Sequence, residues 1–212
     1  MQIDHVTVGA TDLEAGARFV RSKLDVDIPN GGKHPHMSTH NKVARVGDGV
    51  FLEIIAIDPG APPPPRPRWF GLDDPGQAAR LAGSPGPIGW VVRTADIAAV
   101  QARSPVDLGP ASSMSRGELT WKLTIPDSGV QPFAGLVPAF IEWDGEPHPS
   151  VKMAFPGPRL KSVILRHPRP KELASVLHAL GISHLADIEQ GGDMPSLAFA
   201  FERPGGGIAK IE

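Results

Sequence analysis

The chain has 212 residues and no cysteine, which excludes disulfides, thiolate catalysis and thiolate metal ligands. Hydrophobic residues make up 41% and charged residues 21%, so the chain can bury a core, while a formal net charge of −2 argues against a nucleic-acid partner. No apolar run approaches the roughly 20 residues that span a bilayer, so we expect a soluble, cytoplasmic protein without a membrane partner.

Residues 1–58 are predicted to form one βαβββ module. The module opens with a short β-rich run, and Thr11 followed by Glu14 matches a helix-capping pattern. Apolar residues then recur at helical spacing. Residues 36–46 and 50–57 are predicted strands, joined by the turn "GDG".

A proline-rich segment follows in residues 59–85. The stretch "PGAPPPPRPRW" can be neither a helix nor a central strand, because proline lacks the N–H group and fixes φ. We interpret it as an extended linker, with a docking point for a partner protein as the alternative. A short helix is predicted over Gln77–Leu81.

The opening of the chain recurs twice. Residues 88–102 align with residues 3–17 almost without gaps, and residues 160–181 form a third copy, each with a strand followed by an amphipathic helix. Each copy also closes on a strand in which an aliphatic residue precedes glutamate, in "FLEII", "FIEWD" and "AKIE". We therefore predict a second module over residues 86–145 and a third over residues 159–212.

Alternation along the strands predicts which side chains share a face. The helix of the first module needs an apolar sheet face. The valines of the opening strand and the aliphatic residues of the closing strand supply one. His5 and Glu53 are then directed to the face without the helix, which becomes a cleft if the sheet is curved. Residue-by-residue overlay of the repeats places Trp90 and Glu142 at the corresponding positions of the second module.

Repeated βαβββ modules, with histidine in an opening strand and glutamate in a closing strand, resemble the vicinal oxygen chelate superfamily. That superfamily includes glyoxalase I, extradiol dioxygenases and fosfomycin-resistance proteins. The stretch "GGKHPHMSTHNKVARVGDGVFLEIIAIDP" resembles its glyoxalase-like subfamily. The resemblance implies an α+β fold in which paired modules form a curved mixed sheet, with the helices on the convex side.

The resemblance also implies a divalent metal in the cleft, which would be Zn²⁺, Mn²⁺, Fe²⁺ or Ni²⁺. Its ligands would be His5, Glu53 and Glu142, and Glu142 would also be the catalytic base. Trp90 departs from the pattern because indole is not a metal ligand. Either the cleft has lost the metal and kept an apolar floor, or His40 replaces the missing ligand.

The implied function is that of a metal-assisted lyase, isomerase or dioxygenase acting on a small oxygen-rich or aromatic substrate. Trp90, Phe51, Met37 and Arg45 are the candidate substrate-binding residues. The alternatives are a metal-free protein that binds and sequesters a small molecule, and a scaffold that docks through its proline-rich segment.

Three further features have alternative interpretations. Arg116, like the other arginines near the predicted cleft, is either a carboxylate anchor or a solvated residue. His34 is predicted to lie in a mobile loop rather than in a preformed site. The third module either packs across a homodimer interface or is a structural appendage.

Overall fold

The computed structural model describes residues 1–212 and has the predicted α+β class, with twelve strands in two mixed sheets. The strands are β1 (Gln2–Gly9), β2 (Asn30–His34), β3 (Thr39–Gly47), β4 (Val50–Ile57), β5 (Gly86–Arg93), β6 (Ala111–Arg116), β7 (Leu119–Thr124), β8 (Ala139–Trp143), β9 (Arg159–His167), β10 (Asp187–Gln190), β11 (Ser196–Glu202) and β12 (Ile208–Ile211). The α-helices are α1 (Leu13–Leu24), α2 (Pro75–Gly83), α3 (Ile97–Arg103) and α4 (Pro170–Ala179). None of these helices has the length and apolar character that a membrane crossing requires.

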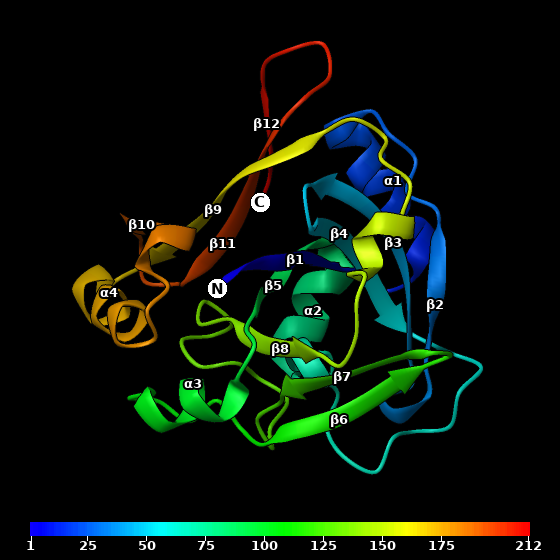
Figure 1. The fold of residues 1–212 in the computed structure, drawn as a ribbon. Coiled ribbons are helices and arrows are strands. Elements are labelled where there is room, and N and C mark those ends of the chain that lie inside the picture. The colour runs from blue at the N-terminus through cyan, green and yellow to red at the C-terminus, as the bar shows by residue number, and fades with distance from the viewer.

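The larger sheet joins the first two modules. Its eight strands lie in the order β2-β3-β4-β1-β5-β8-β7-β6. β1 and β5 are antiparallel neighbours in the middle of the sheet, while β4 runs parallel to β1 and β8 runs parallel to β5. Each closing strand therefore lies beside the opening strand of its own module, and β1 crosses the centre of the molecule (Figure 1).

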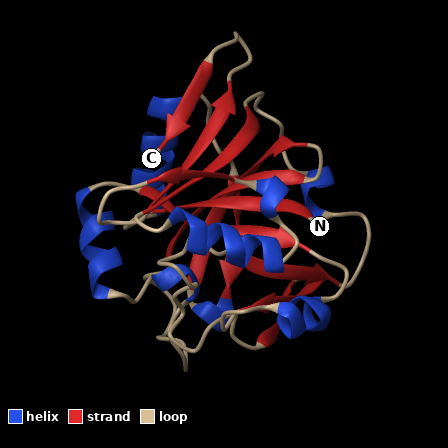
Figure 2. Ribbon diagram, turned by 90° about the vertical axis from the view of Figure 1, so that its left-hand side faces the viewer, coloured by secondary structure: helices blue, strands red, loops and turns tan.

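The larger sheet is curved, and its two faces bury different cores. The convex face carries α1, α3 and the smaller sheet, which share a cluster of 28 buried hydrophobic residues. The concave face encloses a second cluster of 14 buried hydrophobic residues. Helices lie around the periphery of the strands (Figure 2). This arrangement confirms the predicted curved mixed sheet and places α1 and α3 on the convex side as predicted, whereas Leu81 of α2 packs in the concave core.

Residues 159–212 also run in the order βαβββ, but their strands are arranged differently. The smaller sheet has the order β10-β9-β11-β12, so β12 lies beside β11 and β10 takes the place beside β9. Val163 and Phe199 of this sheet join Val8 and Leu52 of the larger sheet in one core. The apolar face of the third module is thus buried within the same chain, and a homodimer remains a prediction.

The helix ends follow the local sequence, with one difference from expectation. α1 is capped by Asp12 rather than Thr11, because the Asp12 carboxylate accepts a hydrogen bond from the Ala15 N–H at 2.7 Å. This bond satisfies a donor that the first turn of a helix cannot pair internally. Gly181, with φ of 74°, follows α4 in the left-handed conformation that commonly ends a helix.

Residues 59–68 contain no helix or strand, as predicted, and they lead into an aromatic plug. Trp69 and Phe70 come directly after this segment, and both belong to the concave core. The helix predicted over Gln77–Leu81 lies within α2. The linker therefore also supplies the side chains that close one side of the concave face.

Gly89 allows the plug to approach β5. A Cβ atom at Gly89 would lie 2.7 Å from Cδ1 of Phe70, which is closer than real contacts permit. We expect Gly89→Ala to displace the Phe70 ring and to lower the free energy of unfolding by about 1–3 kcal/mol, measured by urea denaturation. Gly83→Ala is the matched control, since a Cβ atom at Gly83 meets nothing within 4 Å. An equal loss in both variants would contradict this packing.

Glu142 of β8 holds the start of α3. Its Oε2 accepts a hydrogen bond from the Ile97 N–H at 2.9 Å, and its Oε1 accepts one from Lys122 Nζ at 3.0 Å. The Ile97 N–H first, and Lys122 second, hold the pKa of Glu142 below its usual value of 4.5. The charged carboxylate therefore joins a strand, a helix terminus and a neighbouring strand.

A carboxylate whose pKa is depressed in the folded state stabilises the fold above its unfolded pKa, and this contribution is lost as the pH falls. We therefore expect Glu142→Gln to lower the free energy of unfolding by about 1 kcal/mol at pH 7 and by less below about pH 4. Urea titrations at both pH values test this. Glu118→Gln, in an exposed turn, is the control. A difference that does not change with pH would show that the charge of Glu142 has no part in the contact.

Candidate functional site

A β-bulge in β1 directs two successive side chains toward the concave face. Ile3 pairs with Val92 and His5 pairs with Val91, so Asp4 is an extra residue in β1. Ile3 packs against the convex core, whereas Asp4 and His5 both make hydrogen bonds on the concave side. The bulge therefore brings a carboxylate and an imidazole to the same place.

Asp4 and His5 form a buried dyad. His5 Nδ1 lies 2.7 Å from Asp4 Oδ1, and because an ionised carboxylate only accepts, Nδ1 carries the proton. The His5 ring stacks on Phe51 with 4.5 Å between the ring centroids, which fixes its plane. The second nitrogen, Nε2, lies 3.7 Å from Glu53 Oε2.

Three side chains stabilise the charge of Asp4. Its Oδ1 is bound to His5, and its Oδ2 accepts hydrogen bonds from Trp143 Nε1 and His148 Nε2, each at 2.9 Å. Burial alone would raise the pKa of Asp4, but the hydrogen bonds from His148 and His5 outweigh it and hold that pKa well below its usual value of 3.8. Asp4 is therefore ionised although its side chain is fully buried.

Glu53 is held by an amide relay. The Gly32 N–H donates to Asn41 Oδ1 at 2.8 Å, and Asn41 Nδ2 donates to Glu53 Oε1 at 2.7 Å. The other oxygen, Oε2, accepts a longer hydrogen bond of 3.4 Å from Thr7 and faces His5. The 3.7 Å between Glu53 Oε2 and His5 Nε2 exceeds a strong hydrogen bond, so a small substrate group can lie within reach of both atoms.

His34 of β2 lines the same pocket, next to Asn41. Its Nε2 is 3.4 Å from Asn41 Nδ2 and 3.3 Å from Arg116 Nη1, and its Nδ1 is 3.1 Å from Thr39 Oγ1. Burial lowers the pKa of His34 to about 4; Glu53 opposes this shift and the charge of Arg116 adds to it. The ring is therefore neutral at pH 7, and Nε2 accepts hydrogen bonds.

Aromatic side chains form the remaining walls of the pocket. Trp69, Trp121 and Trp143 line it together with Phe51 and Ile141. The cavity has a volume of about 50 Å³, whereas a cavity that holds benzene is about 150 Å³. The pocket therefore admits a molecule of a few heavy atoms and surrounds it with apolar surface.

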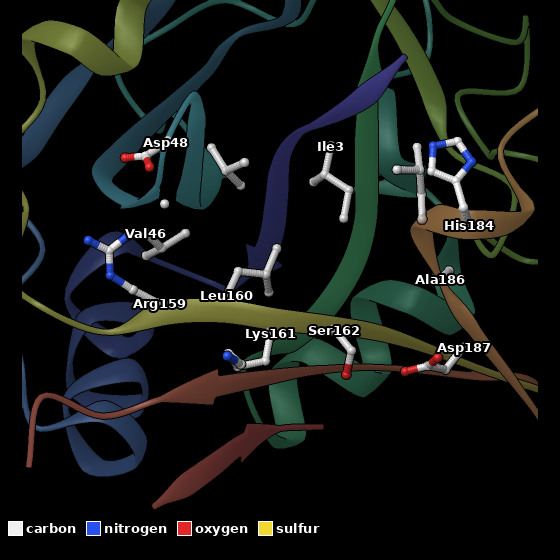
Figure 3. Close-up of a pocket in the computed structure, with 13 residues that line it drawn as sticks. Ile3, Val46, Asp48, Arg159, Leu160, Lys161, Ser162, His184, Ala186 and Asp187 are labelled. Carbon is white, nitrogen blue, oxygen red and sulfur yellow. The ribbon is translucent and has the colours of Figure 1, made fainter. Parts of the chain in front are cut away.

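A larger hollow of about 460 Å³ lies where the third module meets β3 and β4. Asp48 and Arg159 lie at one end of it, and His184 and Asp187 lie at the other (Figure 3). All four side chains are exposed, so water and salt screen their charges. The buried, mutually bonded ionisable groups are in the concave pocket, and we assign the chemistry there.

The predicted residues of the first module divide into two groups. Three of them line the pocket, namely His5, Phe51 and Glu53. Met37 is fully buried in the concave core beside the pocket rather than in its wall. Arg45 points along the same face, but its guanidinium lies over the Phe155 ring at 5.2 Å, outside the pocket.

Trp90 and Glu142 lie on the convex side, which differs from expectation. Trp90 pairs with Val6 and is fully buried in the convex core, and the Glu142 carboxylate is bound to the start of α3. The residue-by-residue overlay of the repeats misplaced both by one position, and a shift of one residue moves a side chain to the other face of a sheet. The neighbouring residues Val91 and Ile141 face the concave side instead.

The donor set does not fit the metal centre that the resemblance implies. His5 and Glu53 approach each other, but Glu142 is on the opposite face, and the second module offers apolar side chains in its place. No three histidine, aspartate or glutamate side chains are arranged to hold a metal ion. His40 also fails to complete the set, because it points away from Asn41 to the other face of β3. Two protein ligands are fewer than the three of a usual catalytic site.

Asp4, which holds His5, and the pocket residues His34, Asn41 and Trp69 were not among the predicted site residues. A carboxylate directly before His5 in an apolar strand was a usable signal for Asp4, since a buried charge needs partners. Asn41 alternates with Val43 along β3 and could have been placed by the two-residue period. His34 was expected in a loop, and Trp69 follows a linker that has no periodicity.

The sequence and the fold match known proteins. Residues 3–181 match the family described as "Glyoxalase-like domain". A comparison with curated proteins gave no match.

Among solved structures, a hypothetical protein from Staphylococcus aureus has 15% identity and a TM-score of 0.57, with 84% of this chain and 74% of that chain covered. A variant of 4-hydroxymandelate synthase from Streptomyces coelicolor has 15% identity and a TM-score of 0.50, with 97% and 60% covered. Methylmalonyl-CoA epimerase from Mycobacterium tuberculosis has 14% identity and a TM-score of 0.42, with 69% and 89% covered. The TM-scores of the first two structures show a shared fold, and the family match shows that the chain belongs to the glyoxalase-like domain family of the vicinal oxygen chelate superfamily.

Proposed function

We propose that the chain is an enzyme that moves a proton on a small substrate, as an isomerase or a lyase does, with His5 as the general base. One observation carries this proposal. Asp4 Oδ1 holds His5 Nδ1 at 2.7 Å, so that Nε2 is directed toward Glu53 Oε2, 3.7 Å away, in a buried pocket. A carboxylate that holds an imidazole in one tautomer prepares it to accept a proton.

The proposed step breaks a C–H bond next to a carbonyl group. His5 Nε2 takes the proton, and the electron pair of the C–H bond moves to the carbonyl oxygen to give an enolate. The imidazolium that forms lies between the carboxylates of Asp4 and Glu53, which stabilise its charge. Return of the proton to the same or a neighbouring carbon completes an isomerisation.

The volume of the pocket limits the size of the substrate. A volume of about 50 Å³ supports a small oxygen-rich molecule over an aromatic one, because it is well below the roughly 150 Å³ of a cavity known to bind benzene. The simplest compounds with an activated C–H bond and this size are short 2-oxo compounds. The mechanism uses no metal step, because no three histidine, aspartate or glutamate side chains are arranged to hold a metal ion.

We expect the protein to accelerate deuterium exchange into the methyl group of pyruvate above the buffer background in D₂O, measured by ¹H NMR. His5→Gln should abolish the acceleration. Asp4→Asn should reduce it about 100-fold or more, because His5 would no longer be held in the required tautomer. His178→Gln, in an exposed position of α4, is the control and should exchange pyruvate at the wild-type rate.

The same assay with pyruvamide and 2-oxobutanoate, and with EDTA, completes the test. Exchange that persists in a folded His5→Gln variant would remove the base from the mechanism. Loss of exchange in EDTA would point to metal chemistry instead. If the wild-type protein exchanged none of the three compounds, the proposal would be rejected.

A further inference from the structure

The pocket has a second polar end, formed by Arg116 and Trp69, that the proton transfer does not use. We propose that this end binds a carboxylate, so that the substrate is a small 2-oxo acid. The inference rests on the proposed function, since it names the substrate class for the same pocket. Neither residue belongs to the pair that would move the proton.

Arg116 brings a positive charge that no side chain of the protein neutralises. Its Nη1 lies 3.3 Å from His34 Nε2, and a neutral imidazole accepts a hydrogen bond without carrying a charge. Glu53, the nearby acid of the pocket wall, is bound to Asn41, and Asn41 and His34 lie between it and the guanidinium. Gly32 leaves room for the Arg116 side chain, because a Cβ atom at Gly32 would lie 2.9 Å from Arg116 Cδ.

Trp69 brings a buried donor without an acceptor. Its side chain lines the pocket and the residue is only 5% exposed, and its Nε1 has no hydrogen-bond partner. A buried N–H group without an acceptor is unfavourable and uncommon. The indole ring meets the edge of His34 at 5.1 Å between centroids, so Trp69 and Arg116 both adjoin the same imidazole.

These two side chains match a carboxylate. Its charge would pair with the single guanidinium, and its oxygens would accept hydrogen bonds from Arg116 and from the indole N–H. A phosphate carries more charge and needs more donors, and a cavity of about 50 Å³ favours the smaller group. With the carboxylate at Arg116, the carbonyl and the adjacent C–H bond extend toward His5 and Glu53.

The indole N–H signals of ¹⁵N-labelled protein test the inference, with pyruvate as the probe and pyruvamide as its neutral counterpart. Trp69→Phe identifies the Trp69 signal. Pyruvate should shift this signal and should bind about 10-fold or more tightly than pyruvamide, because the charge-assisted contact is lost in the amide. The Trp90 signal is an internal reference, since its Nε1 is already bound to the Leu136 carbonyl at 2.9 Å.

Substitutions then assign the preference to Arg116. Arg116→Gln should weaken pyruvate binding about 10-fold and leave pyruvamide binding within about twofold, so that the preference disappears. Arg116→Lys keeps the charge without the planar fork and should give an intermediate value. Arg18→Gln, at an exposed position of α1, is the matched control. Equal binding of the two probes by the wild-type protein, or an unchanged preference in Arg116→Gln, would overturn the inference.

The two proposals fail in different ways. If pyruvate is preferred through Arg116 but no exchange occurs, the carboxylate site stands and the proton transfer is rejected. If exchange depends on His5 but is equally fast for pyruvate and pyruvamide, the proton transfer stands and the carboxylate site is rejected.

Discussion

The buried carboxylate of Asp4 is the contact on which the concave pocket depends. It accepts hydrogen bonds from His5 of β1, from Trp143 of β8 and from His148 in the segment after β8. An ionised carboxylate with no exposed surface is tolerated only with donors of this quality. The contact therefore ties the opening strand of the first module to the end of the second, and it also orients the imidazole of His5.

The two halves of the larger sheet have the same arrangement of strands but different side chains on the concave face. The first module supplies the polar strip that contains His5, His34, Asn41 and Glu53, whereas the concave side chains of β5 and β8 are apolar. An apolar wall excludes water and strengthens the electrostatic interactions of the groups that face it. Because the second module has apolar side chains where the family pattern has metal ligands, an apolar surface lies opposite the ionisable groups.

The sequence was sufficient for the fold class and for part of the pocket. Helical and strand periods, together with the repeats, predicted three βαβββ segments, because these signals extend over many residues, and the family resemblance implied the curved sheet. The position of His5 and Glu53 on one face followed from the two-residue period of β1 and β4.

Positions that depend on a single residue of register could not be predicted in this way. Trp90 and Glu142 were assigned by aligning repeats, but an alignment carries no information about a bulge such as the one at Asp4. One residue of slip exchanges the two faces of a strand. Trp69 reaches the pocket from a linker whose path is decided by long-range packing, including the close approach of Phe70 to Gly89, and no local pattern encodes such a path.

The charges along the pocket also restrict how a substrate can lie in it. Asp4 and Glu53 make one end negative, whereas Arg116 makes the other end positive and the neutral His34 between them adds no charge. A carboxylate near Glu53 would be repelled, and one near Arg116 would be attracted, in surroundings where low polarity strengthens both effects. A 2-oxo acid therefore has one favourable orientation, with its carboxylate at Arg116. In that orientation the carbon that loses its proton in the proposed reaction is directed toward His5, so the groups proposed to bind the substrate would also select the bond that reacts.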